Sequence, residues 1–113
     1  MTPDTFNYGN QYRGDTLDQV QFTLKSGTSI IDLTDVSVKC QFRQPFQGKI
    51  AKEITNGDGI TIANPTLGVM VIDPFILDWD AGTYIYDIEF TYPSGAIKTY
   101  IKGTINIISD TTV

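Results

Sequence analysis

Two long runs of alternating apolar and polar residues constrain the fold of this chain more than any other feature. Apolar side chains are spaced by two over residues 84–92, and again over residues 97–107. A period of two is typical of a β-strand with one dry and one wet face. Between the runs, Pro93 and Gly95 hold the second and fourth positions of a four-residue turn. The pattern predicts a long antiparallel hairpin that sets the register of the core.

Shorter runs of the same kind fill most of the remaining sequence. Residues 20–24 and 36–42 alternate cleanly, and the second run places Cys40 on the inward face as a small buried hydrophobe. The sequence is rich in Tyr, Phe, Ile and Thr, which favour strands. Turn signals recur at roughly ten-residue intervals, which is typical of sandwiches. We therefore predict an all-β, antiparallel immunoglobulin-like β-sandwich of about seven to eight strands with an extended N-terminal arm.

The length of 113 residues fits one domain. We assign residues 1–15 to the extended arm, residues 16–109 to the sandwich and residues 110–113 to a C-terminal tail. One helical turn is expected within residues 73–80, because Asp73 can cap a helix and Pro74 suits its first position.

Asp80, Gly82 and Tyr84 form a D-x-G-x-Y sequence just before the first strand of the hairpin. This pattern resembles the tyrosine corner of immunoglobulin-like domains, in which a Tyr hydroxyl bonds back to upstream backbone. The resemblance gives Tyr84 a structural role at the corner. Immunoglobulin domains carry a Cys two residues later, and Tyr86 stands there instead, so no disulfide joins the sheets.

Several classes of chemistry are excluded by composition. The chain has no histidine and one cysteine, which removes Ser-His-Asp and Cys-His mechanisms and imidazole metal sites. We therefore expect no enzymatic activity, no catalytic residues, no cofactor and no metal. The net charge of −5 disfavours nucleic acid and anionic membranes as partners. No apolar stretch has transmembrane length.

Acidic and aromatic residues gather before the hairpin. Trp79 with Asp78 and Asp80 is a candidate ligand platform, since Trp stacks on sugars and Asp accepts their hydroxyl protons; the alternative is that Trp79 closes the end of the core. Asp73 joins these carboxylates as a possible calcium site, although their spacing matches no EF-hand loop. On the hairpin, the basic stripe of residues 98–102 is expected to pair across strands with the carboxylates of residues 87–89.

The arm carries three aromatic residues, Phe6, Tyr8 and Tyr12. We name them as candidate interaction residues. Either they fold back on the edge of their own domain or they dock on a neighbouring subunit.

An ordered set of segments resembles small β-sandwich proteins of tailed bacteriophages and prophages, such as the N-terminal domains of baseplate upper proteins and head- and tail-associated immunoglobulin-like modules. The segments are Arg13-Gly14-Asp15-Thr16, Ile31-Asp32-Leu33-Thr34-Asp35-Val36, Val38-x-Cys40-x-Phe42-Arg43, Ile54-Thr55-Asn56-Gly57-Asp58-Gly59-Ile60, Pro65-x-x-Gly68, Trp79-x-x-Gly82-x-Tyr84-x-Tyr86-Asp87 and Pro93-x-Gly95.

The resemblance implies a non-enzymatic structural or adaptor protein of a virion, located in the particle after assembly in the host cytoplasm. Its partners would be other virion proteins, in multiple copies or as a homo-oligomer, bound through the arm and strand edges. The place in the particle, whether capsid, neck, tail or baseplate, stays open. The alternative function is a carbohydrate- or receptor-binding module of a phage or bacterial surface protein.

Overall fold

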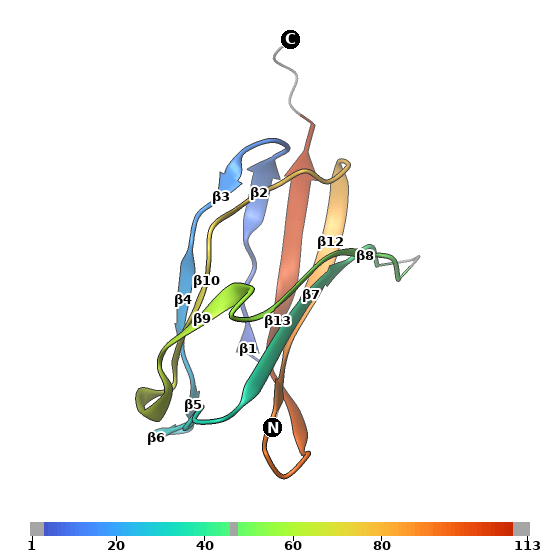
Figure 1. Ribbon diagram of the computed structural model, residues 1–113. Coiled ribbons are helices and arrows are strands. Elements are labelled where there is room, and N and C mark those ends of the chain that lie inside the picture. The colour runs from blue at the N-terminus through green and yellow to red at the C-terminus, as the bar shows by residue number, and fades with distance from the viewer. Residues whose placement is uncertain (1–3, 46–47, 110–113) are drawn as a thin grey trace.

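The computed structural model describes residues 4–45 and 48–109, and these residues form a β-sandwich (Figure 1). Eight of its strands have four or more residues, in agreement with the number predicted: β2 (Gly9–Tyr12), β4 (Val20–Thr23), β7 (Ser37–Arg43), β8 (Ile50–Asn56), β9 (Gly59–Asn64), β10 (Val69–Ile72), β12 (Gly82–Thr91) and β13 (Ile97–Ile108). Five two-residue strands complete the set: β1 (Asp4–Thr5), β3 (Thr16–Leu17), β5 (Lys25–Ser26), β6 (Ser29–Ile30) and β11 (Phe75–Ile76). The predicted fold class, an all-β sandwich, is confirmed.

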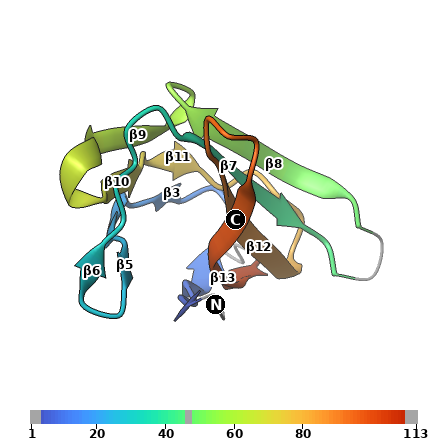
Figure 2. The same cartoon turned by 90° about the horizontal axis from the view of Figure 1, so that it is seen from below.

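One continuous sheet folds over to make both layers. Its strand order is β1-β13-β12-β7-β8-β9-β10-β4, and β2 also pairs with β13. The fold-over lies between β8 and β9, where Thr55 pairs with Gly59 around a tight turn. Seen from below, the sheet curls round, with β9 and β10 on one side of the domain and β8 and β12 on the other (Figure 2). Two small pairs, β3–β11 and β5–β6, lie outside this sheet.

The predicted hairpin is the longest pairing in the molecule. β12 and β13 pair from Gly82↔Ile107 to Thr91↔Ile97, and β7 pairs on the other side of β12. The alternation is broken once, because a β-bulge follows Ile88 and places Tyr100 out of register. Tyr100 consequently packs 5.1 Å from Phe90, while Ile97 is 60% exposed instead of inward.

The predicted helical turn within residues 73–80 is wrong. This segment is extended and includes β11, which pairs with β3. Leu77 and Trp79 are buried while Ile76, Asp78 and Asp80 are exposed, so the side chains follow a period of two. Burial of alternate apolar side chains outweighs the local preference of Asp73-Pro74 for a helix start. The described residues contain one short 3-10 helix, η1 (Pro65–Leu67), and no helix there is long enough to cross a membrane.

The arm extends the sheet. β1 and β2 run parallel to β13, with Asp4↔Ile101 and Gly9↔Ile105 as the first pairs of each. Residues 4–15 are therefore an edge strand and its turn, joined to the domain that we assigned to residues 16–109. Residues 1–3 and the predicted tail of residues 110–113 lie outside the described part of the chain.

Candidate binding site

The arm is held against β13 by main-chain hydrogen bonds along its whole described length. Between β1 and β2, the Phe6 amide donates to the Lys102 carbonyl at 2.9 Å, and the Tyr8 amide donates to the Thr104 carbonyl at 2.9 Å. From Thr5 to Gly9 the arm advances four residues while β13 advances three, from Lys102 to Ile105. The extra residue is a β-bulge, and it turns one arm carbonyl toward the core.

That carbonyl belongs to Phe6, and it accepts a hydrogen bond from the Tyr86 hydroxyl. Tyr86 reaches the arm by passing over Gly103, its direct partner in β13. A Cβ at position 103 would overlap the Phe6 carbonyl oxygen and lie 2.9 Å from Cε1 of Tyr86. Gly103 therefore permits a close approach of arm, strand and ring that no other residue type allows.

The arm aromatics lie on the edge of their own domain. Phe6 packs edge-on at 5.5 Å from Phe22 of β4, so it bridges the two edges of the sheet. Tyr8 enters the aromatic core, 5.4 Å from Tyr86 and 6.2 Å from Phe42. Tyr12 is 53% exposed at the end of β2. We expected these candidate interaction residues either to fold back on their own domain or to dock on a neighbouring subunit. Phe6 and Tyr8 fold back on their own domain.

The Tyr8 hydroxyl is buried without a hydrogen-bond partner in the described residues. Burial raises the pKa of this phenol, and it stays protonated through the neutral range. A buried donor without a partner costs about 1–3 kcal/mol. The arm is thus docked with one unfavourable polar group.

Tyr8→Phe is expected to raise the free energy of unfolding by about 1 kcal/mol, because it removes that hydroxyl and keeps the ring. Tyr86→Phe is the matched variant and should lower it by a similar amount, since it deletes the hydrogen bond to Phe6. Urea unfolding followed by Trp79 fluorescence measures both. Equal destabilisation by the two substitutions would contradict this account of Tyr8.

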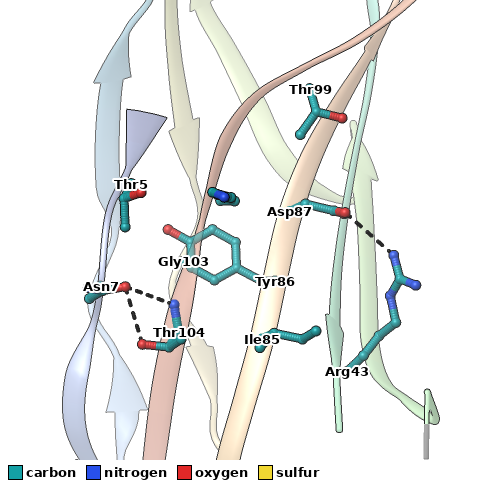
Figure 3. Close-up of a pocket in the computed structure, with 10 residues that line it drawn as sticks. Thr5, Asn7, Arg43, Ile85, Tyr86, Asp87, Thr99, Gly103 and Thr104 are labelled. Carbon is teal, nitrogen blue, oxygen red and sulfur yellow. Dashed lines mark hydrogen bonds and ion pairs between the residues drawn. The ribbon is translucent and has the colours of Figure 1, made fainter. Parts of the chain in front are cut away.

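A trough lies on the outer face of the sheet, with the arm as one of its walls (Figure 3). It has a volume of about 620 Å³ and is open to solvent. Thr5 and Asn7 stand on the arm side, and Arg43 stands opposite on β7 (Figure 3). Asn7 is fixed there because its Oδ1 accepts from the Thr104 amide at 3.0 Å. The full lining is Thr5, Asn7, Arg43, Ile85, Tyr86, Asp87, Thr99, Lys102, Gly103 and Thr104.

The charges in the trough are unevenly paired. Arg43 lies 3.6 Å from the Asp87 carboxylate, and on the same two strands Lys39 lies 3.9 Å from Glu89. Lys102 faces Asp87 across the β12–β13 ladder, yet it makes no ion pair within 4.0 Å in the described residues. The expected pairing of the basic stripe of residues 98–102 with these carboxylates is therefore met only in register, at Lys102 and Asp87, while β7 supplies the ion-pair partners of both carboxylates.

Trp79 closes the end of the core. Its side chain is buried and lies 5.1 Å from both Phe42 and Tyr84. Asp78 and Asp80 point to solvent and contact Arg13 at 3.6 and 3.4 Å. Asp78, Trp79 and Asp80 thus line a second, smaller hollow of about 210 Å³. Because the Trp79 side chain is buried, its ring offers no open face on which a sugar could stack.

The predicted tyrosine corner is present. The Tyr84 hydroxyl donates to the Asp80 carbonyl at 2.7 Å and pins the entry of β12. Cys40 is fully buried, as predicted, and burial raises the pKa of its thiol. Asp73 accepts from the Thr61 hydroxyl at 2.9 Å, apart from the Arg13 pairs. Within residues 4–45 and 48–109, no three His, Cys, Asp or Glu residues are grouped to hold a metal ion.

Sequence reasoning missed the trough and the role of Gly103. The available signal was the glycine itself, which interrupts an otherwise apolar row of inward positions in β13. A glycine inside a strand often marks a close backbone approach. The sequence did not mark Asn7 and Arg43 as trough residues, because polar residues that line a site follow the same alternating pattern as other solvent-facing polar residues.

With the fold and site described, the class of the protein is a β-sandwich domain whose edge is extended by a parallel arm. No family model and no curated protein matches the chain. Among solved structures, it is similar to CopC from Methylosinus trichosporium OB3b, with a TM-score of 0.51 at 12% sequence identity. The alignment covers 92% of this chain and 88% of CopC. At this identity the likeness concerns the fold alone.

These comparisons correct the bacteriophage prediction. The solved structure named above is a bacterial CopC, and no family model of phage proteins matches the chain. The predicted phage family, virion adaptor function and virion location are therefore wrong, and the carbohydrate- or receptor-binding alternative gains no support. The segments that suggested phage proteins are explained by general sandwich features, such as the Tyr84 corner and the positive φ of Gly14 and Gly57 in turns.

Proposed function

We propose that this chain is a non-enzymatic binding domain whose trough holds a carboxylate-bearing segment of a partner protein. The observation that carries the proposal is Lys102, an exposed cation in the trough whose facing carboxylate, Asp87, is engaged by Arg43. A ligand carboxylate would supply the missing partner.

The rest of the lining suits a polypeptide. Asn7, Thr5 and Thr99 offer amide and hydroxyl groups that donate and accept hydrogen bonds. Ile85 is 41% exposed and gives an apolar contact. The net charge of −5 does not forbid an acidic ligand, because remote charges are screened over about 8 Å at physiological salt while Arg43 and Lys102 lie in the site.

The test uses two ten-residue peptides that differ only in carrying glutamate or glutamine at the same positions. With ¹⁵N-labelled protein, the glutamate peptide should shift the amides of residues 85–87 and 102–104. Lys102→Ala should weaken its binding about fivefold, as expected for one exposed ion pair of about 1 kcal/mol. Lys98→Ala is the matched control, because Lys98 is exposed on the same strand outside the trough.

Equal binding of the two peptides would contradict the proposal. So would amide shifts confined to the far layer, or equal losses in the Lys102 and Lys98 variants.

A further inference from the structure

The arm is separable from the core that it covers. Every buried core side chain lies between Leu17 and Ile107, and none comes from residues 4–16. The two layers therefore supply every buried core side chain, and the Tyr8 ring of the arm covers part of that core at Phe42 and Tyr86. The arm adds an edge strand and partly buried aromatic contacts from Tyr8.

The arm is also specific for the groove in which it lies. The floor of the groove is shaped by Gly103, which leaves space for the Phe6 backbone, and by Tyr86, which donates to it. Farther along, the side-chain Nδ2 of Asn106 donates to Asn10 Oδ1 at 2.9 Å. Every one of these contacts joins the arm to the body of the domain. A second arm of identical sequence would reproduce all of them.

The junction between arm and body is a short exposed turn. The Asp15 amide donates to the Tyr12 carbonyl at 3.1 Å, and Gly14 has a φ of +92°. The Arg13 side chain makes only exposed contacts with Asp78 and Asp80, which contribute at most about 1 kcal/mol each. The backbone of the junction is anchored more firmly: the Arg13 amide donates to the Ile108 carbonyl at 2.9 Å, and the Gly14 amide donates to the Leu77 carbonyl at 2.7 Å. Opening this turn at Gly14 would let the chain continue straight, at the loss of the Asp15–Tyr12 and Gly14–Leu77 hydrogen bonds, while the Arg13–Ile108 bond moves with the arm.

We propose that the arm is exchanged between two copies of this chain, so that residues 4–12 of each copy pair with β13 of the other. Exchange of an identical element keeps the contacts of the closed form and alters only the junction. In the exchanged pair, Thr5 and Asn7 of one copy complete the trough of its partner copy. The unpartnered Tyr8 hydroxyl is present in both arrangements, so it lowers only the cost of freeing the arm from the groove, the step through which exchange proceeds.

Single-cysteine variants can detect the exchange directly. Asn10 lies opposite Asn106 in the arm–β13 ladder, and Thr83 lies opposite Asn106 in the β12–β13 ladder. All variants carry Cys40→Ala, so that the introduced thiol stands alone. Asn10→Cys and Asn106→Cys chains are mixed, unfolded, refolded together at about 1 mM, near the effective concentration of a short tether, and then oxidised.

The expected result is a disulfide-linked dimer in severalfold excess over that from a Thr83→Cys and Asn106→Cys mixture treated in the same way. Thr83 belongs to the body, so it has no route to the Asn106 of another copy. Chains that carry both cysteines of either pair should form the internal disulfide, which establishes that each geometry can be oxidised. Equal dimer yields from the two mixtures would overturn the proposal.

Discussion

Phe42→Ala is expected to cost about 3–5 kcal/mol of stability, a large share of the 5–15 kcal/mol typical of a domain. Phe42 is fully buried at the centre of the aromatic cluster, with Trp79 at 5.1 Å, Tyr86 at 5.2 Å and Phe75 at 5.9 Å. Truncation removes apolar contacts from both layers and leaves a cavity that rigid rings cannot fill. Urea unfolding followed by far-ultraviolet circular dichroism measures the loss.

Two companion variants make the result interpretable. Phe42→Leu retains part of the volume and should cost less than Phe42→Ala. Ile76→Ala, at a side chain that is 64% exposed, should change stability by no more than about 0.5 kcal/mol. A loss at Ile76 comparable with that at Phe42 would show that the core is not where the structure places it.

Gly103→Ala is expected to displace the arm. The new Cβ would overlap the Phe6 carbonyl oxygen and crowd the Tyr86 ring, and neither belongs to a flexible side-chain end. The arm, and not β12, should separate from β13, because the β12–β13 pairing spans the whole hairpin. Hydrogen exchange should reveal lost protection of the Phe6 and Tyr8 amides, while the amides of β7 and β12 keep theirs.

The control is the same substitution in a chain that lacks residues 1–12. There the clash with the Phe6 carbonyl is absent, and the Tyr86 ring, no longer bonded to Phe6, can shift away from the new Cβ. Alanine is also favoured over glycine within a strand by roughly 0.5–1 kcal/mol. Gly103→Ala should therefore be neutral or stabilising in the shortened chain and destabilising in the full chain. A similar loss in both chains would rule out the arm as the cause.

Much of the fold could be predicted because its strongest signals are local. The hairpin of β12 and β13 follows from strict alternation around a Pro-x-Gly turn, and the inward position of Cys40 follows from the same rule. Tyr84 could be assigned because a corner needs only one Tyr and the backbone four residues upstream.

Non-local contacts explain the errors in the predicted fold. The arm shows no clear period, since a carbonyl is turned inward between β1 and β2 and its partner strand lies almost a hundred residues away. The bulge after Ile88 reverses the faces of Tyr100 and Ile97, which no alternating pattern can reveal. The Asp73-Pro74 segment starts like a helix, but Leu77 and Trp79 become buried only if it is extended.

The site was predicted less well than the fold. Phe6, Tyr8 and Tyr12 were singled out as isolated aromatics in a polar segment, and two of them pack on the domain itself. The trough depends on which polar residues of β7, β12, β13 and the arm come together, and only the three-dimensional pairing determines that. Turn-and-strand motifs common to sandwiches suggested a family that the comparisons do not bear out.

The pairing of arm and β13 also sets the order of events during synthesis. Residues 4–12 emerge from the ribosome before every other described strand, whereas β13 is the last described strand to be made. The arm therefore has no strand to pair with, and its aromatic side chains stay uncovered, until nearly all of the described residues have been translated. The sheet edge can be completed only after β13 has been translated. A nascent chain stalled before β13 would therefore expose an unpaired arm with apolar aromatic side chains.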